Sequence, residues 1–323
     1  MKRIFVTGAL GQIGSELVVK LKELYGSRNV IASDVKDIGK DNYEGVLFEP
    51  LDVTDGERFF KIVKRHKIDT IMHLGALLSA VAEQYPQKAW DVNMMGLYNA
   101  LEVSRELECA LFTPSSIAAF GPTTPKDNTP QDTIQRVDTM YGITKVSGEL
   151  LCDYYFKKFG VDTRGIRLPG IISYKTLPGG GTTDYAVEIF YEALRSKEYT
   201  SFIAEGTKMD MMCMEDAVNA IIKLMEADPS KLIHRNAFNA TAMSLAPEDI
   251  ASEIKKHIPE FKLYYDVDPI RQAIAESWPN SIDDTAAREE WGFSAKHDLA
   301  SMTELMLEKL SIKLNIEYNP PAA

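Results

Sequence analysis

A tyrosine and a lysine four positions apart, Tyr141 and Lys145, stand in a stretch whose pattern predicts a helix over 139–159. At this spacing both side chains lie on one helix face, so the ammonium can lie beside the phenol. A neighbouring cation favours the ionised phenol, which can take the proton of an alcohol. The serines Ser115 and Ser116 could supply a hydroxyl to the same reaction. Taken alone, the tyrosine–lysine pair is more often structural, so the surrounding elements must decide.

Three glycines follow the first predicted strand, Arg3–Thr7, and precede a helical pattern. Their spacing, G-x-x-G-x-x-G, suits a dinucleotide site. The first glycine permits a tight turn, the second lets backbone amides approach a pyrophosphate, and the third allows close helix packing. The segment that would meet the cofactor comprises Gly8, Gly11, Gln12, Ile13 and Gly14.

Acidic residues lie at the ends of the next two predicted strands, Asn29–Asp34 and Val46–Leu51. Asp34 lies about 20 residues beyond the last glycine, where a carboxylate accepts a hydrogen bond from the adenosine ribose and repels a 2′-phosphate. We therefore expect NAD rather than NADP, although Asp34 could instead cap a helix or turn. Asp52 and Val53 could contact the adenine, or Asp52 could only shape the turn.

Small residues follow a fourth predicted strand that begins at Asp69, and they would let a backbone pass close to the cofactor. These residues are Leu74, Gly75 and Ala76. Ser79 lies in the continuation. A long helix is predicted over 86–107, and its Asn93 is polar among apolar neighbours, so this amide either touches the cofactor or bonds a loop backbone. A fifth strand, over 110–116, brings the two serines to the same sheet edge.

Strand and helix patterns alternate through the first half of the chain, which predicts an α/β fold with a doubly wound parallel sheet of the Rossmann type. A sixth strand is expected over 162–168. We expect an NAD-binding domain over residues 1–170, with a strand near 234–240 returning to it, and a smaller α/β substrate-binding part over residues 171–323. The further elements expected are helices over 185–194, 215–226 and 247–257 and strands over 236–240 and 262–267.

Composition excludes several classes of function. The 323-residue chain carries a formal net charge of −11, which disfavours nucleic acid or an anionic membrane as a partner. No apolar run is long enough to span a bilayer and no signal-peptide pattern opens the chain, so we expect a cytoplasmic protein. The cysteines lack metal-binding spacing, so we expect buried free thiols and no metal site. They are Cys109, Cys152 and Cys213.

Two stretches in the second half could complete a substrate site. The glycine-rich segment 177–181 is followed by Thr182, Thr183 and Asp184 and then by a predicted helix. Such a segment could cradle a small carboxylate, with Asp184 available to an amine. It could equally be a connector whose threonines only cap the helix. Trp278 could return an aromatic lid to the site, although tryptophan is more often part of a core.

These motifs together resemble the extended short-chain dehydrogenase/reductase family, in its UDP-galactose epimerase-like branch. The resemblance rests on the glycine triplet, Asp34, Asp52-Val53, Ser115-Ser116, Phe120-Gly121 and Tyr141-Gly-x-Thr-Lys145. It implies that Tyr141 is the acid/base, that Lys145 holds the nicotinamide ribose and that Ser116 bonds the reacting oxygen. It also implies that Leu168 and Pro169 pack against the nicotinamide. A homodimer through the helices after position 86 and before position 159 is implied as well.

The position of Met209 separates branches of that family. Its nucleotide-sugar enzymes usually have an arginine there that clamps the substrate diphosphate, and methionine cannot donate a hydrogen bond to phosphate. The chain also resembles the short-chain type of L-threonine 3-dehydrogenases, a group within this branch, at Ser79, 182–184, 211–216 and Trp278. By that resemblance the amino acid is surrounded by Ser79, Ser116, Tyr141, Thr182, Thr183, Asp184 and Trp278.

This resemblance implies oxidation of L-threonine at carbon 3 to 2-amino-3-ketobutyrate, with hydride transfer to NAD and a 2-amino-3-ketobutyrate CoA ligase as metabolic partner. Two rival functions remain. An NAD-dependent nucleotide-sugar epimerase or dehydratase would need a phosphate clamp elsewhere, at Arg195, Arg235 or Arg271. A non-catalytic NAD-sensing scaffold of this fold usually lacks the tyrosine or the lysine, and both are present here.

Overall fold

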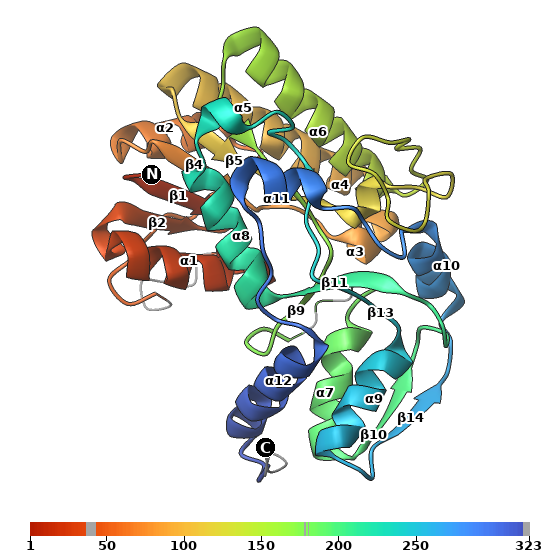
Figure 1. Cartoon of the computed structure of the whole chain (residues 1–323). Coiled ribbons are helices and arrows are strands. Elements are labelled where there is room, and N and C mark those ends of the chain that lie inside the picture. Colours follow the sequence, from red (N-terminus) through yellow and green to blue (C-terminus); the bar gives the residue numbers. More distant parts are fainter. Residues whose placement is uncertain (37–42, 178, 180, 319–323) are drawn as a thin grey trace.

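The computed structural model describes residues 1–36, 43–177, 179 and 181–318. Pro178 and Gly180, which belong to the glycine-rich segment singled out above, lie outside the described residues. Parallel strands form the central sheet in the order β3-β2-β1-β4-β5-β7 (Figure 1). This order is that of a Rossmann sheet, so the predicted doubly wound α/β fold is confirmed. The strands are β1 (Ile4–Thr7), β2 (Val30–Ser33), β3 (Leu47–Phe48), β4 (Thr70–His73), β5 (Ala110–Phe112) and β7 (Thr163–Arg164).

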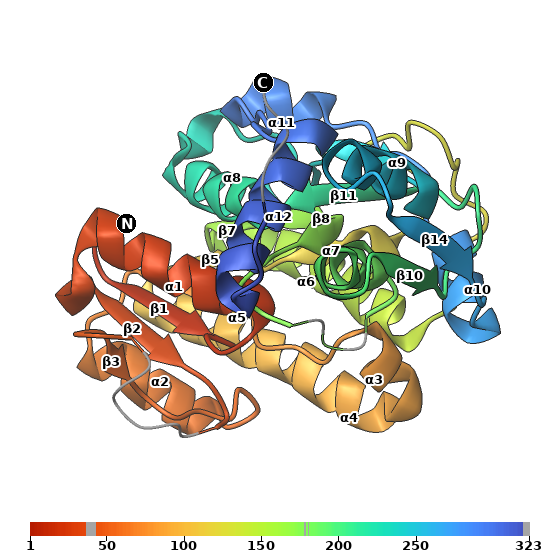
Figure 2. The same ribbon diagram turned by 90° about the horizontal axis from the view of Figure 1, so that it is seen from below.

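Helices cover both faces of this sheet, and Figure 2 shows β1 and β2 between α1 and α2. Ile4 and Val6 pack in one apolar cluster with α1 and α8, whereas Phe5 and Ile31 pack in another with α2, α5 and α6. Neighbouring strand residues thus point to opposite faces, and burial of both faces explains the continuous apolar runs in the sequence. The helices are α1 (Gln12–Tyr25), α2 (Gly56–Arg65), α5 (Gly96–Leu107), α6 (Met140–Phe159) and α8 (Met214–Glu226).

Three predicted elements are less regular than expected. The helix over 86–107 consists of α4 (Pro86–Trp90), a π-helical turn (Asp91–Met95) and α5. The predicted strand over 110–116 is divided into β5 and β6 (Ser115–Ser116), because Pro114 has no N–H group that could donate a hydrogen bond to a neighbouring strand. The strand over 162–168 is likewise divided into β7 and β8 (Ile166–Leu168). A short helix that was not predicted, α3 (Ser79–Gln84), follows β4.

A small parallel sheet in the order β12-β8-β6 continues from the divided strands. Its strand β12 (Phe238–Asn239) lies within the segment near 234–240 and pairs with β8. The chain therefore returns to the N-terminal part of the molecule after α8, and this return brings Asn239 beside Arg167.

The C-terminal part packs below the central sheet in the view of Figure 1. Its strands are β9 (Gly170–Ile172), β10 (Glu198–Ser201), β11 (Met209–Cys213), β13 (Met243–Leu245) and β14 (Lys262–Tyr265). Its helices are α7 (Tyr185–Arg195), α9 (Pro247–His257), α10 (Pro269–Ser277) and α12 (Leu299–Leu314). Helix α11 (Thr285–Trp291) instead packs beside the central sheet, where Ala287 and Trp291 join the apolar cluster of α1 and α8. A sheet in the order β13-β11-β9 joins the C-terminal part to the N-terminal part, because β9 follows directly after β8 in the chain. The core of the C-terminal part includes Tyr185 and Phe190.

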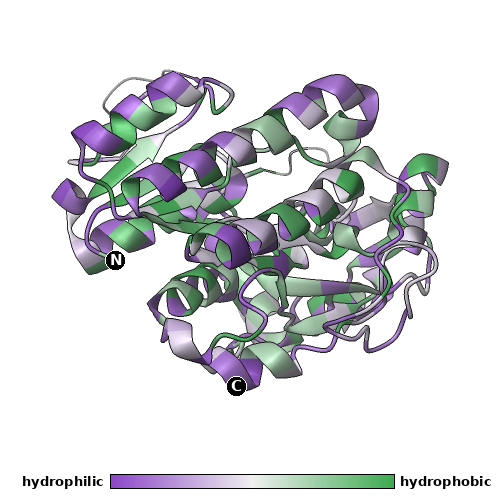
Figure 3. Ribbon diagram, turned by 90° about the horizontal axis from the view of Figure 1, so that it is seen from above, coloured by the Kyte–Doolittle hydropathy of each residue, from purple (hydrophilic) through white to green (hydrophobic). Residues whose placement is uncertain are grey.

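Most of the large apolar side chains are buried in three clusters, and Figure 3 shows hydrophilic and hydrophobic segments alternating along the helices. The three cysteines are free and buried, as expected, and burial raises the pKa of each thiol. Among the described residues, no helix is both long enough and apolar enough to cross a membrane.

Candidate functional site

One cavity of about 240 Å³ opens at the carboxyl edge of β1, β4 and β6, the edge where ligands bind in open parallel sheets. It brings together side chains from both parts of the chain. The predicted site residues that line it are Gly8, Gly11, Gln12, Ile13, Gly14, Leu74, Ala76, Ser79, Ser116, Tyr141, Lys145, Leu168, Pro169, Thr182, Thr183, Asp184 and Trp278. The sequence did not single out Leu78, Ile117, Gly170 or Ile171, which also line it.

The glycine loop has the features of a pyrophosphate site. Gly11 precedes α1, no side chain caps this helix, and its first turn contains no acidic residue. The first amides of the helix, at Gln12 and Ile13, therefore suit an anion at the cavity wall. The packing is so close that a Cβ added at Gly14 would lie 2.2 Å from the Gly8 carbonyl oxygen. The residues present thus fit a dinucleotide.

Five of the predicted cofactor residues do not line this cavity, and three of these five follow strands β2 and β3. Asp34 accepts a hydrogen bond from the Leu10 amide at 3.1 Å, which holds its carboxylate beside the glycine loop. Asp52 accepts from the Thr54 amide at 3.0 Å and from the Thr54 hydroxyl at 2.7 Å, so it shapes the turn after β3. Val53 is buried. Of these residues, Asp34 lies where it could bond a ribose.

Gly75 and Asn93 line a second, smaller cavity of about 40 Å³ behind Lys145. Its volume suits water rather than a cofactor ring. The Asn93 amide accepts from Leu77 N at 2.7 Å, and it donates to Leu77 O and Thr144 Oγ1, each at 3.1 Å. The Asn93 side chain therefore bonds the backbone of a loop, which is one of the two interpretations that the sequence left open.

The start of α6 fixes the tyrosine and the lysine. Thr139 caps the helix by accepting from the Gly142 amide at 3.1 Å, which places Tyr141 in the first turn. The Lys145 ammonium donates to the Pro114 carbonyl at 2.6 Å and lies 5.3 Å from the centroid of the Tyr141 ring. Both side chains line the main cavity. A phenol and an ammonium thus lie side by side at the carboxyl edge of the sheet.

Ser116 stands opposite this pair at the end of β6. Its Oγ accepts from the Ala118 amide at 3.2 Å, and this bond leaves the hydroxyl hydrogen available for a substrate oxygen.

His73 is buried nearby, and desolvation together with the charge of Lys145 lowers its pKa to about 3. A neutral imidazole therefore lies beside Thr7 Oγ1, at 3.0 Å from Nδ1. Among the described residues, no group of three His, Cys, Asp or Glu side chains could hold a metal ion.

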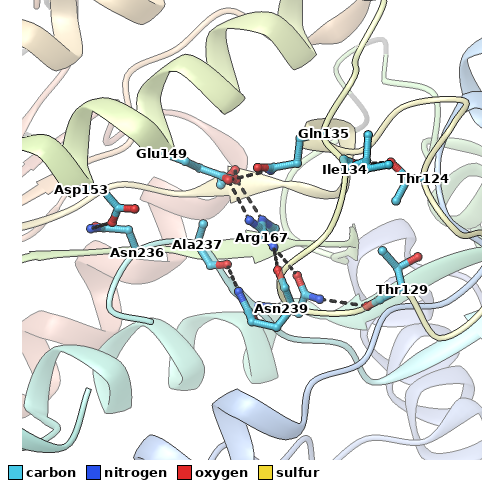
Figure 4. A network of polar contacts seen from close by, with 12 residues as sticks. Thr124, Thr129, Ile134, Gln135, Glu149, Asp153, Arg167, Asn236, Ala237 and Asn239 are labelled. Carbon is cyan, nitrogen blue, oxygen red and sulfur yellow. Dashed lines mark hydrogen bonds and ion pairs between the residues drawn. The ribbon is translucent and has the colours of Figure 1, made fainter. Parts of the chain in front are cut away.

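A buried ion pair supports the strand that carries the serines (Figure 4). Arg167 donates to both Glu149 oxygens, at 3.0 and 2.9 Å, and to Asn239 Oδ1 at 3.0 Å. Ser115 donates to the same carboxylate. Because Glu149 lies on α6, this network ties α6, β6, β8 and β12 together behind Ser116. The sequence signal for it was a charged residue within an otherwise apolar strand, which requires a buried partner.

The C-terminal part supplies the opposite wall of the cavity. Asp184 precedes α7, and its Oδ2 accepts from the Gly181 amide at 2.6 Å. Thr182 is buried, while Thr183 is partly exposed. Trp278 is only 6 % exposed and still lines the cavity, so it belongs both to the core and to the site wall.

Among the described residues of the cavity wall, no arginine is present to clamp a diphosphate. Among the described residues that line it, Lys145 is the only lysine or arginine. Met209 is fully buried in the apolar cluster of the C-terminal part. The three arginines considered for a clamp elsewhere bond to acidic residues away from the cavity wall. Their pairs are Arg195–Glu192, Arg235–Asp162 and Arg271–Asp268.

Comparisons with known proteins place the chain among NAD-linked enzymes. Residues 4–240 match the profile of the NAD dependent epimerase/dehydratase family. An uncharacterized epimerase/dehydratase of Staphylococcus haemolyticus is 60% identical over 314 residues, which cover 97% of this chain and 99% of that protein.

Solved structures of similar sequence are described as L-threonine dehydrogenases. The one from Clostridium difficile superposes with a TM-score of 0.95 at 64% identity, covering 97% of this chain and 98% of that one. A monomeric L-threonine 3-dehydrogenase from a metagenome database superposes with a TM-score of 0.92 at 47% identity, covering 97% of this chain and 99% of that one.

Proposed function

The chain belongs to the NAD-dependent epimerase/dehydratase family of extended short-chain dehydrogenases/reductases, and from that premise we propose that it oxidises L-threonine at carbon 3 to 2-amino-3-ketobutyrate. The broader assignment is to the NAD-dependent oxidoreductases. Two kinds of support narrow it: the chemistry of the cavity wall, and the description of solved relatives at up to 64% identity as L-threonine dehydrogenases.

Tyr141 acts as the base in this proposal. Its phenolate takes the proton of the threonine β-hydroxyl, and the neighbouring Lys145 ammonium stabilises the phenolate. Ser116 donates its hydroxyl hydrogen to the same substrate oxygen, which orients carbon 3. NAD, when bound, accepts the hydride from carbon 3, so the products are the ketone, NADH and a proton.

The opposite wall would hold the amino-acid end of the substrate. We propose that the threonine carboxylate lies near Thr182 and Thr183 at the N-terminus of α7, where the helix dipole favours an anion. The ammonium lies near the Asp184 carboxylate. Ser79 and Trp278 close the wall around the side-chain methyl. In this division of labour, residues 1–170 hold NAD and residues 171–323 supply most substrate contacts.

The single observation that carries the proposal is the set of charges on the cavity wall. A carboxylate and several hydroxyls line the same cavity as the tyrosine, and Lys145 is the only lysine or arginine among the described lining residues. A zwitterionic amino acid matches such a wall. A nucleotide sugar would bring two phosphate charges, which need positive partners that this wall does not supply.

A substrate panel tests the proposal. Purified protein is mixed with NAD and, in turn, L-threonine, D-threonine, L-serine or a nucleotide sugar, and NADH absorbance is followed. We expect NADH with L-threonine. A sugar-nucleotide epimerase would convert its substrate without net NADH, and a non-catalytic NAD-binding scaffold would convert none of them, so either result rejects the proposal.

We also propose that the chain forms a homodimer through α4, α5 and α6. Apolar side chains on these helices are exposed in the single chain, namely Trp90, Tyr98, Leu150 and Tyr154. Such a patch suits a second copy of the same surface. Sedimentation of the wild type and of Leu150→Glu tests this, with a dimer expected for the first and a monomer for the second. A monomeric wild type, like the relative described as monomeric, would reject the dimer.

The product chemistry points to a metabolic partner. A 2-amino-3-keto acid breaks easily at a carbon–carbon bond next to its ketone. An enzyme that consumes this acid at once would prevent its spontaneous breakdown. We propose a 2-amino-3-ketobutyrate CoA ligase in this place, as the family resemblance implies.

A further inference from the structure

Glu16 lies in the second turn of α1, just below the helix end that faces the cofactor site. We propose that Glu16 is a positioning residue, which couples occupation of the cofactor site to the segment that supports the substrate wall. The inference rests on the proposed function for the identity of the substrate. The coupling itself can be measured without any substrate.

Within the part of the chain that the structure describes, both polar partners of the Glu16 carboxylate lie in one short segment, residues 173–176, which we call the stem. Ser173 Oγ donates to Oε1 at 2.7 Å, and Lys175 Nζ lies 3.1 Å from Oε2. Glu16 is only 5 % exposed, and a carboxylate this deeply buried is costly unless it is paired and hydrogen-bonded. Ser15 adds a hydroxyl contact to Thr176 at 3.4 Å. The beginning of α1 is therefore fastened to the stem.

The stem continues directly from β9, on which the substrate wall rests. The side-chain amide of Gln12 donates through Nε2 to Ile171 O at 3.5 Å, so α1 also contacts β9 itself. A Cβ added at Gly170 would lie 2.9 Å from Thr183 Cγ2, which means that Thr183 packs directly on the strand. A continuous set of contacts thus runs from α1 through β9 and the stem to Thr183.

A second anchor holds the stem from another side and does not involve α1. The Lys313 ammonium of α12 donates to Tyr174 O at 3.0 Å, to Lys175 O at 2.8 Å and to the Tyr191 hydroxyl at 3.0 Å. This anchor connects the stem to α12 and α7 alone. Lys313 therefore offers a matched control, because its loss loosens the stem without changing its attachment to the cofactor-binding helix.

These contacts have a thermodynamic consequence. A pyrophosphate bound at the N-terminus of α1 restricts that helix, and through Glu16 it restricts the stem and β9. A substrate that binds next meets a wall that is already ordered and loses less conformational entropy. Couplings of this kind typically change affinity about 5- to 150-fold. Contact alone does not establish coupling, so the test must measure it.

Hydrogen exchange of the full-length protein, with and without NAD, measures the coupling. We expect NAD to slow exchange of the amides of residues 171–176 by at least about fivefold in the wild type. Glu16→Gln and Lys175→Met should lose most of this slowing, and Lys175→Arg should keep it. Lys313→Met should exchange faster in the free protein and still respond to NAD. An unchanged response to NAD in both Glu16→Gln and Lys175→Met overturns the proposal.

Steady-state kinetics then separates the coupling from the proposed function. Glu16→Gln should raise KM for L-threonine at least about fivefold and leave kcat within about twofold, because Glu16 touches no reacting atom. An equal loss of kcat, with KM unchanged, would contradict the positioning role. If the wild type makes no NADH from L-threonine while NAD still protects the stem through Glu16, the proposed substrate is wrong and the coupling stands.

Discussion

The two walls of the cavity are built in different ways. The wall that we propose for the cofactor consists largely of backbone from one continuous segment, Gly8–Gly14, at the end of β1 and the start of α1. The wall that we propose for the substrate consists of side chains from distant segments, with Ser79, Thr182–Asp184 and Trp278 as its main members. Tyr141 lies between the two walls. A backbone wall is specific for a shape common to all dinucleotides, whereas a side-chain wall can change its substrate by a few substitutions.

The strongest test of this contrast is at the tyrosine between the walls. Tyr141→Phe removes the base and leaves both walls in place, so kcat should fall by about 10²- to 10⁴-fold while NAD affinity stays nearly constant. Turnover of L-threonine and NAD titration measure the two effects. Tyr264→Phe is the matched control, because its exposed side chain lies on β14, away from the cavity lining and from the proposed dimer surface. Near-normal turnover in Tyr141→Phe would remove this residue from the mechanism.

Glycine substitutions in the two walls should separate cofactor binding from substrate binding. In Gly14→Ala the new Cβ would lie 2.2 Å from a backbone oxygen that cannot move aside, so NAD binding should weaken by about tenfold or more. In Gly170→Ala the nearest atom is Met211 Sδ at 2.4 Å, at the end of a flexible side chain. The second variant should mainly raise KM for the substrate. If it weakened NAD binding as much as the first, the division between the walls would be wrong.

The choice between NAD and NADP should depend on Asp34, which lies beside the glycine loop. Asp34→Ala combined with Val35→Arg replaces a carboxylate with a guanidinium, and Val35 is exposed enough to accept the longer side chain. Removing the ribose bond and adding a phosphate partner should shift the NADP-to-NAD ratio of kcat/KM about tenfold or more toward NADP. An unchanged preference for NAD would show that a different residue contacts the ribose.

A separate effect, on stability rather than on binding or turnover, is expected in the C-terminal part. Burial raises the pKa of Asp210 from 3.8 to about 7, although Thr241 and the Ile282 amide donate hydrogen bonds to it. Between those values the folded protein binds more protons than the unfolded chain, so the free energy of unfolding contributed by this group falls as pH rises. The slope is at most about 1.4 kcal/mol per pH unit.

Denaturant unfolding of the wild type and Asp210→Asn between pH 4 and pH 8 checks this expectation. The wild type should lose stability relative to the variant as pH rises toward 7, and the difference should become constant above it. Identical slopes for the two proteins would show that Asp210 ionises in the folded state as it does in the unfolded chain.

The same contrast explains what could be predicted from the sequence. Glycine spacing predicted the cofactor loop because its physical requirements fall within seven consecutive residues, and strand–helix alternation predicted the Rossmann sheet. The ion pair of Arg167 and Glu149 was not predicted, because its partners lie on different elements. Strand β9 and its contact with α1 were missed for the same reason: nothing local in 170–176 indicates that Glu16 lies beside it.

Where the fold does not depend on long-range contacts, local chemistry was sufficient. The Thr139 cap and the start of α6 agree with the predicted helix over 139–159. Asp52 and Asn93 each had two interpretations, and the structure contains the turn-shaping and loop-bonding hydrogen bonds. Their contact with a cofactor stays a prediction.

The central claim is that hydride leaves carbon 3 of L-threonine for NAD while Tyr141 takes the hydroxyl proton. L-threonine carrying deuterium at carbon 3 tests it most directly, with the mass of the NADH product as the measurement. We expect one deuterium in each NADH formed. NADH without deuterium, or no NADH at all from a protein that binds NAD, would contradict it.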